Sequence, residues 1–224
     1  MENKKIAVAI DGPAGAGKST LSKSLAKELG FIYVDTGALY RTIGLFFIKK
    51  GYTECPDFDL TEELKGISIE IKFIDETQHV FLNGNDVSSE IRTPLASMMA
   101  SAVSAKPEVR AFLLDMQRNL AANNSVVMDG RDIGTVVLPD AEVKIFLTAS
   151  VETRALRRFK ELKEKGSEAT YEEVLEDMQK RDYNDSNRAI APLKPAQDSV
   201  LADTSDKNLE ESLELLIGIV KGNI

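Results

Sequence analysis

The sequence predicts an α/β fold with a five-stranded parallel sheet, and three observations carry this prediction. Short, unbroken apolar runs alternate with longer amphipathic segments along most of the 224 residues, as buried strands and covering helices do in a parallel sheet. A glycine-rich loop joins the first apolar run to the first amphipathic segment. A stretch in the middle of the chain instead alternates apolar and polar residues, which indicates a small antiparallel β insert.

The expected elements of the parallel sheet alternate along the chain. Gly30 and Gly51 directly follow amphipathic segments, and glycine commonly ends a helix. Thr170 and Glu173 have the spacing of a capping box, which predicts the start of a further helix. The expected strands are residues 5–10, 31–34, 125–129, 143–147 and 199–202. The expected helices of this part are residues 18–29, 37–50, 151–165, 170–185 and 208–220.

The insert is expected to be a meander of three short strands. Asn83-Gly84 is a strong signal for a hairpin turn between two of them. Pro94 and Pro107 suit the first turn of two helices that follow the meander. The expected strands are residues 67–73, 78–82 and 85–88, and the two helices are residues 94–104 and 107–122.

We interpret residues 1–224 as a single unit with one core and two attachments. The core consists of about residues 1–58 and 105–224, and the insert of about residues 59–104. A helical lid is expected at about residues 154–170, where a charged helix runs into the flexible sequence Gly-Ser-Glu-Ala.

Composition narrows the class of function. Hydrophobic residues make up 43% of the chain and charged residues 29%, which is typical of a folded globular protein. The formal net charge of −8 argues against a general basic surface for nucleic acid, so no nucleic-acid partner is expected. No apolar run is long enough for a signal peptide or a membrane span. We therefore expect a cytoplasmic protein with no membrane partner.

The scarcity of cysteine and histidine excludes several kinds of site. The single cysteine, Cys55, cannot form an intrachain disulfide, and we expect a free thiol in a loop. With only one histidine, His79, a Cys/His zinc site is implausible, and so is a Cys–His nucleophile pair.

The glycine-rich loop matches the phosphate-binding loop, or P-loop, pattern without deviation: Gly12-x-x-x-x-Gly17-Lys18-Ser19. Glycine lets successive backbone N–H groups point at phosphate oxygens, and the following helix adds the positive end of its dipole. Lys18 can reach the β- and γ-phosphates, and the Ser19 hydroxyl can ligate Mg²⁺. The sequence therefore predicts a P-loop NTPase core.

Three kinds of nucleotide protein share this loop. A GTPase switch should carry an Asn-Lys-x-Asp tetrapeptide, which this chain lacks. An ATPase motor usually has a longer chain and a track to act on. A small-molecule kinase needs a second, polar pocket for the phosphoryl acceptor, and the position of the arginines favours this third class.

Arginine suits bidentate phosphate binding and the charge of a phosphoryl group in transfer. Arg131 follows Asp129 at the end of an expected core strand, at the edge where α/β sheets bind ligands. Arg41 also follows closely after a strand. We interpret these arginines as an anion site, with surface salt bridges as the alternative. Two further sets have the spacing of one helix face: Arg181, Asp185 and Arg188, and Arg154, Arg157 and Arg158.

Four stretches of the chain together carry a specific resemblance. These are IDGPAGAGKST, VDTGALYR, MDGRDIGTVVLPDA and RDYNDSNRAIAPLKPA. They closely resemble the bacterial cytidylate kinase family, and the match runs from near the first residue to the last helix. The resemblance implies Mg²⁺-dependent phosphoryl transfer from ATP to CMP or dCMP, giving ADP and CDP or dCDP. We expect a monomer.

The resemblance also implies roles for individual residues. The ATP-binding residues would be Gly12, Pro13, Ala14, Gly15, Ala16, Gly17, Lys18, Ser19, Thr20 and the lid residue Arg157. The CMP-binding residues would be Thr36, Tyr40, Arg41, Ser101, Arg110, Arg131, Asp132, Arg181, Asp185 and Arg188. Among these, Ser101, Arg110 and Asp132 would read the cytosine edge, and Arg181 and Asp185 would contact the pentose. The catalytic residues would be Lys18, Arg131, Arg158 and Arg188.

Several alternatives stay open at this point. Ser19 is the expected Mg²⁺ ligand, and Asp129 either holds the ion through water or tethers the loop as a structural acid. The acceptor could be another monophosphate, such as UMP. A nucleotide-binding regulatory module would keep the P-loop but would not need the acceptor arginines.

Overall fold

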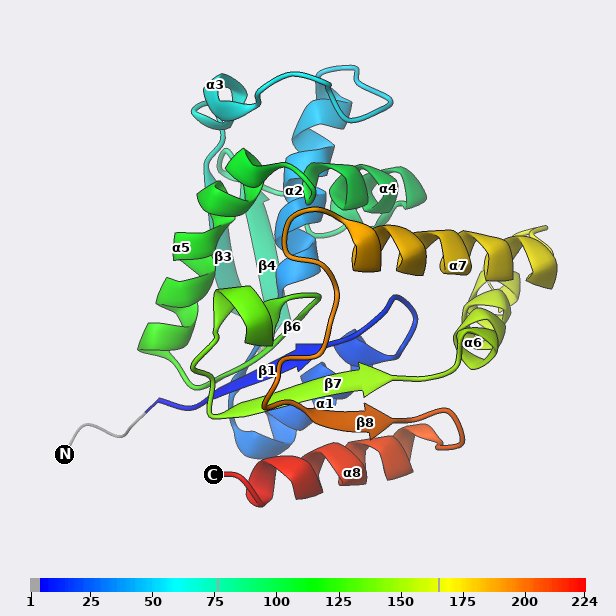
Figure 1. Ribbon diagram of the computed structural model, residues 1–224. Coiled ribbons are helices and arrows are strands. Elements are labelled where there is room, and N and C mark those ends of the chain that lie inside the picture. Colours follow the sequence, from blue (N-terminus) through cyan, green and yellow to red (C-terminus); the bar gives the residue numbers. More distant parts are fainter. Residues whose placement is uncertain (1–4, 76, 165) are drawn as a thin grey trace.

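The computed structural model describes residues 5–75, 77–164 and 166–224, which form two sheets. The strands of the larger sheet are β1 (Ala7–Asp11), β2 (Ile32–Asp35), β6 (Val126–Gly130), β7 (Val143–Thr148) and β8 (Val200–Asp203). They are parallel and lie in the order β2-β6-β1-β7-β8. Because β1 is central, the loop that leaves it opens in the middle of the carboxyl edge (Figure 1). The predicted five-stranded parallel sheet is confirmed.

Helices cover both faces of this sheet, and successive residues of each strand point to opposite faces. On one face α1 (Lys18–Leu29) and α8 (Leu209–Lys221) pack on Val8 and Ile10 of β1. On the other face Ala9 packs among residues of β6 and of α5 (Pro107–Asn123). Figure 1 shows α1 and α8 below the sheet and α5 above it.

The insert is a second, antiparallel sheet that packs on one long helix. Its strands are β3 (Ile69–Ile74), β4 (Thr77–Leu82) and β5 (Asn85–Asp86), in the order β3-β4-β5. Fully buried Leu39, Ile43 and Phe47 of α2 (Thr36–Lys49) share a core with Val80 and Leu82 of β4. The same core includes residues of α3 (Thr61–Leu64), α4 (Pro94–Val103) and α5. The insert is therefore joined to the sheet through α2.

Two further helices form a hairpin beside the carboxyl edge of the sheet (Figure 1). They are α6 (Val151–Glu164) and α7 (Tyr171–Asn187). The predicted capping box is present, since Thr170 Oγ1 accepts from the Glu173 N–H and Glu173 Oε2 accepts from the Thr170 N–H. Ala155, Val174 and Met178 form a small core of their own between the two helices.

Most predicted bounds agree with the structure within two residues. The predicted strand 85–88 is two residues too long: β5 ends at Asp86, and the Ser88 side chain, in place of a backbone group, bonds to the Val80 N–H. The sequence also gave no sign of α3, of a 3-10 turn at Glu90–Arg92 or of a π-helix at Ile133–Val137. Positions 1–4, 76 and 165, which fall in the predicted units, lie outside the described residues. Across the described residues, no helix has both the length and the apolar character needed to cross a membrane.

Candidate functional site: a phosphate loop facing an arginine cluster

The phosphate loop lies against the sheet so closely that glycine is required. A Cβ on Gly12 would lie 1.9 Å from the backbone oxygen of Leu147, and the φ of Gly12 is 154°. Gly17 takes a left-handed conformation with φ 85° and begins α1. The N-terminus of α1 therefore faces the loop with its unpaired N–H groups and its positive dipole end.

Lys18 is a buried cation at the base of this loop. Its Nζ donates to the Pro13 carbonyl over 2.6 Å, and its side chain is almost wholly covered. Burial, and next the charge of Arg131, lower the pKa of Lys18 well below its ordinary value. An anion bound between these two cations would relieve their repulsion and favour the charged lysine.

Ser19 and Asp129 place two oxygen ligands side by side at the mouth of the loop. Ser19 Oγ donates to Asp129 Oδ2 over 2.9 Å, and the Tyr33 hydroxyl donates to Oδ1 over 3.1 Å. Burial, and next the charge of Asp35, raise the pKa of Asp129 to about 6. Mg²⁺ prefers oxygen ligands and keeps several waters, so this pair of residues fits that ion. The structure fits both roles predicted for Asp129: its carboxylate tethers Ser19, and it lies where it can hold the ion through water.

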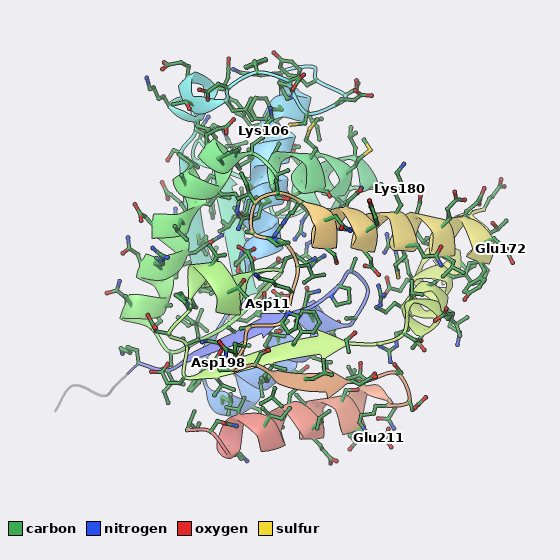
Figure 2. The ribbon with its side chains drawn as sticks, in the orientation of Figure 1. Asp11, Lys106, Glu172, Lys180, Asp198 and Glu211 are labelled. Atoms are coloured by element: carbon green, nitrogen blue, oxygen red, sulfur yellow. The ribbon has the colours of Figure 1, made fainter. Side chains whose placement is uncertain are left out.

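Asp11 connects the phosphate loop to the acceptor side, and this role was not predicted from the sequence. It ends β1, and its two carboxylate oxygens accept from the N–H groups of Ile133 and Gly134 over 2.7 and 2.8 Å. Figure 2 shows Asp11 directly above β1, near the centre of the molecule. Burial raises the pKa of Asp11 to about 6, although both hydrogen bonds oppose that shift. Asp11 thereby fixes the segment that follows Asp132.

Arg41 is held at the start of α2 by Asp35, whose role was also not predicted from the sequence. Asp35 Oδ1 accepts from the Ala38 N–H and caps α2, while Oδ2 accepts from Arg41 Nη2 over 2.7 Å. Arg41 Nε is buried and has no partner within the part of the chain that the structure describes. The Thr36 hydroxyl donates to the Asp129 carbonyl over 2.7 Å, which joins this end of β2 to β6. Within the described residues, Arg41 thus offers an unpaired N–H near the carboxyl end of β2.

Asp132 is buried between two arginines. Arg110 Nη2 donates to Asp132 Oδ2 in a short ion pair, and Arg188 Nη2 lies 3.4 Å from Oδ1. Burial raises the pKa of Asp132, and the two arginines oppose that shift. The Arg110 guanidinium lies 5.7 Å from the ring of Tyr40. Its Nη1 also donates to the Ser104 carbonyl at the end of α4, the helix that carries Ser101.

Arg131 and Asp185 join the sheet edge to α7. Arg131 Nε donates to Asp185 Oδ2 over 2.8 Å, and Asp185 is buried. The surrounding protein, and next the charge of Arg131, lower the pKa of Arg181. Arg181, Arg131 and Lys18 are thus close enough to repel one another. A cluster of cations of this kind is stabilised by a polyanionic ligand.

The three arginines of α6 have three different environments, although their spacing grouped them on one face. Buried Arg154 bonds to the Ala14 carbonyl of the phosphate loop, to the Ala149 carbonyl and to Asp182 of α7. Arg157 donates to the Thr204 carbonyl over 2.8 Å. Arg158 is exposed and pairs with Glu161. Arg154, which was given no individual role, is the one that contacts the phosphate loop.

Most of the residues expected in the site therefore lie near one another, in two groups at the carboxyl edge of the sheet. Lys18, Ser19 and Asp129 lie on one side, and Arg110, Asp132 and Arg188 on the other. Arg157 and Arg158 do not join them among the described residues, because Arg157 bonds to the Thr204 and Lys207 carbonyls and Arg158 pairs with Glu161. Asp11 and Arg154 were missed because their partners are distant in sequence, whereas Asp35, which caps α2 and bonds to the nearby Arg41, carried a local signal.

Comparisons with known proteins agree with this arrangement. The family model "Cytidylate kinase" matches residues 8–222. The cytidylate kinase of Caldicellulosiruptor bescii is 50% identical over 225 residues, which cover 99% of this chain and 100% of that protein. The cytidylate kinase of Caldicellulosiruptor saccharolyticus is 51% identical over 214 residues, which cover 96% of this chain and 95% of that one.

A solved structure supports the fold independently of close sequence similarity. An uncharacterized protein from Eubacterium ventriosum matches 98% of this chain and 99% of its own length with a TM-score of 0.55 at 13% identity. At this identity the likeness concerns the fold alone. The family model and the two relatives cover nearly the whole length, and on that ground the chain belongs to the cytidylate kinase family.

Proposed function

We propose that this protein transfers the terminal phosphoryl group of ATP to CMP or dCMP, giving ADP and CDP or dCDP. The observation that carries the proposal is the buried Asp132, held between Arg110 and Arg188, beside a phosphate loop that faces further arginines. The phosphate loop supplies a triphosphate site, and the arginines supply a site for a second anion. Membership of the cytidylate kinase family supports the choice of both nucleotides.

The proposed transfer depends on positioning and charge rather than on a strong base. The acceptor is a phosphate that is already an anion, so its oxygen needs no deprotonation by the protein. Lys18 and Arg131 would stabilise the charge on the group in transfer, and Arg41 and Arg188 would hold the acceptor phosphate. Asp185 can accept hydrogen bonds from the pentose hydroxyls, and Arg131 holds it in place. Arg158 joins this set only if α6 reorients, because its guanidinium now pairs with Glu161.

Recognition of the base would use Asp132, Arg110 and Ser101. Cytosine presents an amino donor and a ring acceptor, whereas uracil presents a carbonyl and an N–H at the same positions. An ionised Asp132 accepts, Arg110 donates, and the Ser101 hydroxyl does either. Uracil would face a carboxylate with its carbonyl, so the pocket would reject it.

The proposal includes Mg²⁺, which would neutralise charge on the phosphate oxygens of ATP when bound. The Ser19 hydroxyl and the Asp129 carboxylate are the residues that would hold it, Asp129 directly or through water. No group of three or more His, Cys, Asp or Glu side chains suited to a metal occurs within the described ranges, so the remaining ligands would be phosphate and water oxygens.

We also propose that the protein acts as a monomer in the cytoplasm, where its nucleotide substrates are found. The residues named for the proposed site all belong to one chain. Light scattering coupled to gel filtration, with and without nucleotides, tests the monomer.

The proposal is tested by measuring ADP release with ATP alone and with CMP, dCMP and UMP. We expect rapid release with CMP and dCMP, and little with ATP alone or UMP. Lys18→Ala should fold normally and lose at least about 100-fold in turnover, as expected for removal of a preorganised charge. Comparable use of UMP would overturn the cytosine assignment, and no release with any monophosphate would favour a regulatory nucleotide-binding module.

A further inference from the structure

Gln78 makes an unusual contact between the two sheets of the molecule. It lies on β4 of the insert, and its side-chain amide pairs with the backbone of Asp35 at the end of β2. Gln78 Oε1 accepts from the Asp35 N–H over 2.8 Å, and Nε2 donates to the Asp35 carbonyl over 3.3 Å. One side chain therefore bonds to both backbone groups of a residue, as a neighbouring antiparallel strand would.

The positions of β2 and β4 in their sheets allow the contact between Gln78 and the Asp35 backbone. β2 is the edge strand of the parallel sheet, so one side of its backbone is free of sheet partners. β5 pairs with β4 at Phe81 and Leu82, and Gln78 lies beyond that short pairing. Apolar contacts with α2 hold the insert in place but are not directional. The Gln78 amide adds directional hydrogen bonds, which fix the position of β4 along β2.

Asp35 is the residue through which this contact reaches the site. Gln78 holds its backbone, while its carboxylate caps α2 and receives Arg41 Nη2. Arg41 in turn has a buried Nε without a partner in the described parts of the chain. A shift of the Asp35 backbone would therefore change the direction of the Arg41 guanidinium.

We propose that Gln78 is a positioning residue for the acceptor nucleotide: its two hydrogen bonds to Asp35 orient Arg41 toward the acceptor phosphate. The inference rests on the proposed function, because it takes Arg41 as a ligand of that phosphate. Gln78 acts at a distance and does not contact the substrate. Its removal should affect CMP more than ATP, because the hydrogen bonds of Asp35 within the described residues run to Gln78, Ala38 and Arg41 and not to the phosphate loop.

The test compares steady-state kinetics of wild type, Gln78→Met and Gln78→Asn. Methionine has a similar length without hydrogen-bonding groups, and asparagine keeps the amide but is one methylene too short to reach Asp35. Both variants should raise KM for CMP by about tenfold, in line with two lost hydrogen bonds, and leave KM for ATP within about twofold. The matched control is His79→Met on the same strand, which removes a bond to Asp86 that lies wholly within the insert. It should change neither constant.

A double-mutant cycle with Arg41→Met separates a positioning role from a general structural one. If Gln78 acts through Arg41, Gln78→Met should raise KM for CMP no further when Arg41 is already methionine. An equal increase in both backgrounds, or the same increase in His79→Met, would overturn the inference. So would an unchanged KM in both Gln78 variants while Arg41→Met is impaired. If Arg41→Met itself leaves KM for CMP unchanged, the proposed acceptor site fails, and the inference fails with it.

Discussion

Charged side chains of the site form opposed pairs in which the carboxylate is buried. Asp132 lies between Arg110 and Arg188, and Arg131 is bonded to Asp185. Each pair keeps its members in place, since a buried charge without a partner is costly. A bound nucleotide must therefore fit existing hydrogen bonds, and a ligand with the wrong donors leaves buried groups unpaired.

Substitution of Asp132 should change the choice of base. We expect wild type to prefer CMP over UMP by more than about 100-fold in kcat/KM, because its pocket offers an acceptor to the cytosine amino group. Asp132→Ala should lose most of this preference. Kinetics with both substrates on both proteins measure it.

Asp132→Asn is the control that preserves the shape of the pocket. An amide can donate to the uracil carbonyl, so this variant should use UMP better relative to CMP than wild type does. A preference for CMP that survives both substitutions would show that the cytosine edge is read elsewhere.

The buried carboxylate of Asp11 should make stability depend on pH. Its pKa is raised to about 6, so the folded state binds this proton more tightly than the unfolded chain does, and stability falls as pH rises through that range. Asp11→Asn does not ionise. Its free energy of unfolding relative to wild type should therefore increase between about pH 4 and about pH 7, by at most about 3 kcal/mol.

Urea denaturation of both proteins across this pH range provides the measurement. A constant difference between them would mean that the pKa of Asp11 is the same in the folded and unfolded states. The variant should also bind CMP more weakly, because an amide cannot accept from both Ile133 and Gly134 through two oxygens.

The elements of the fold were predictable where their ends carry a local signal. Gly30 ends α1 in a left-handed conformation, and the capping box at Thr170 starts α7. The π-helix at Ile133–Val137 was not predictable, because its apolar sequence has the composition of a strand. Its first N–H groups bond to Asp11, which is more than 120 residues earlier in the chain. Tertiary contact, rather than local propensity, determines this segment.

The α6–α7 hairpin should respond to nucleotides. Its small core is its own, while Arg154 connects it to the phosphate loop and Asp185 connects it to Arg131. Ligands bound on both sides should therefore restrain the hairpin as a lid. We expect limited proteolysis between Arg154 and Tyr171 to slow when ATP and CMP are both present. The ligands should be less effective singly, and equal cleavage rates with and without them would argue against a lid at this position.

At the scale of the whole molecule, the residue types of the site were predictable and their pairing was not. The P-loop pattern and the strand ends indicated where Lys18, Arg41 and Arg131 would gather. Which carboxylate holds which arginine depends on how distant segments meet, as Arg131 and Asp185 do across 54 residues. Local sequence carries no signal for such contacts, so those of Asp11 were missed, whereas Asp35 pairs with the nearby Arg41.

The insert and the parallel sheet should unfold together if the chain is a single unit. Ile43 belongs to the core around α2, and Ile145 to the core between the sheet and α8. Ile43→Val and Ile145→Val should each lower the free energy of unfolding by about 1 kcal/mol, and the double variant by about the sum. One cooperative transition in urea is expected for all three. A transition that splits in Ile43→Val would show that the insert unfolds separately.

The central place of β1 has a consequence for the order of events during synthesis on the ribosome. β1 is translated first among the strands, yet its neighbours in the sheet are Val126–Gly130 and Val143–Thr148. By contrast, the core around α2 is complete once Leu113 has been made. The insert can therefore fold while β1, which carries the phosphate loop, still lacks both neighbouring strands, β6 and β7. The nascent chain therefore cannot bind a nucleotide at the phosphate loop until β6 and β7 have been synthesised.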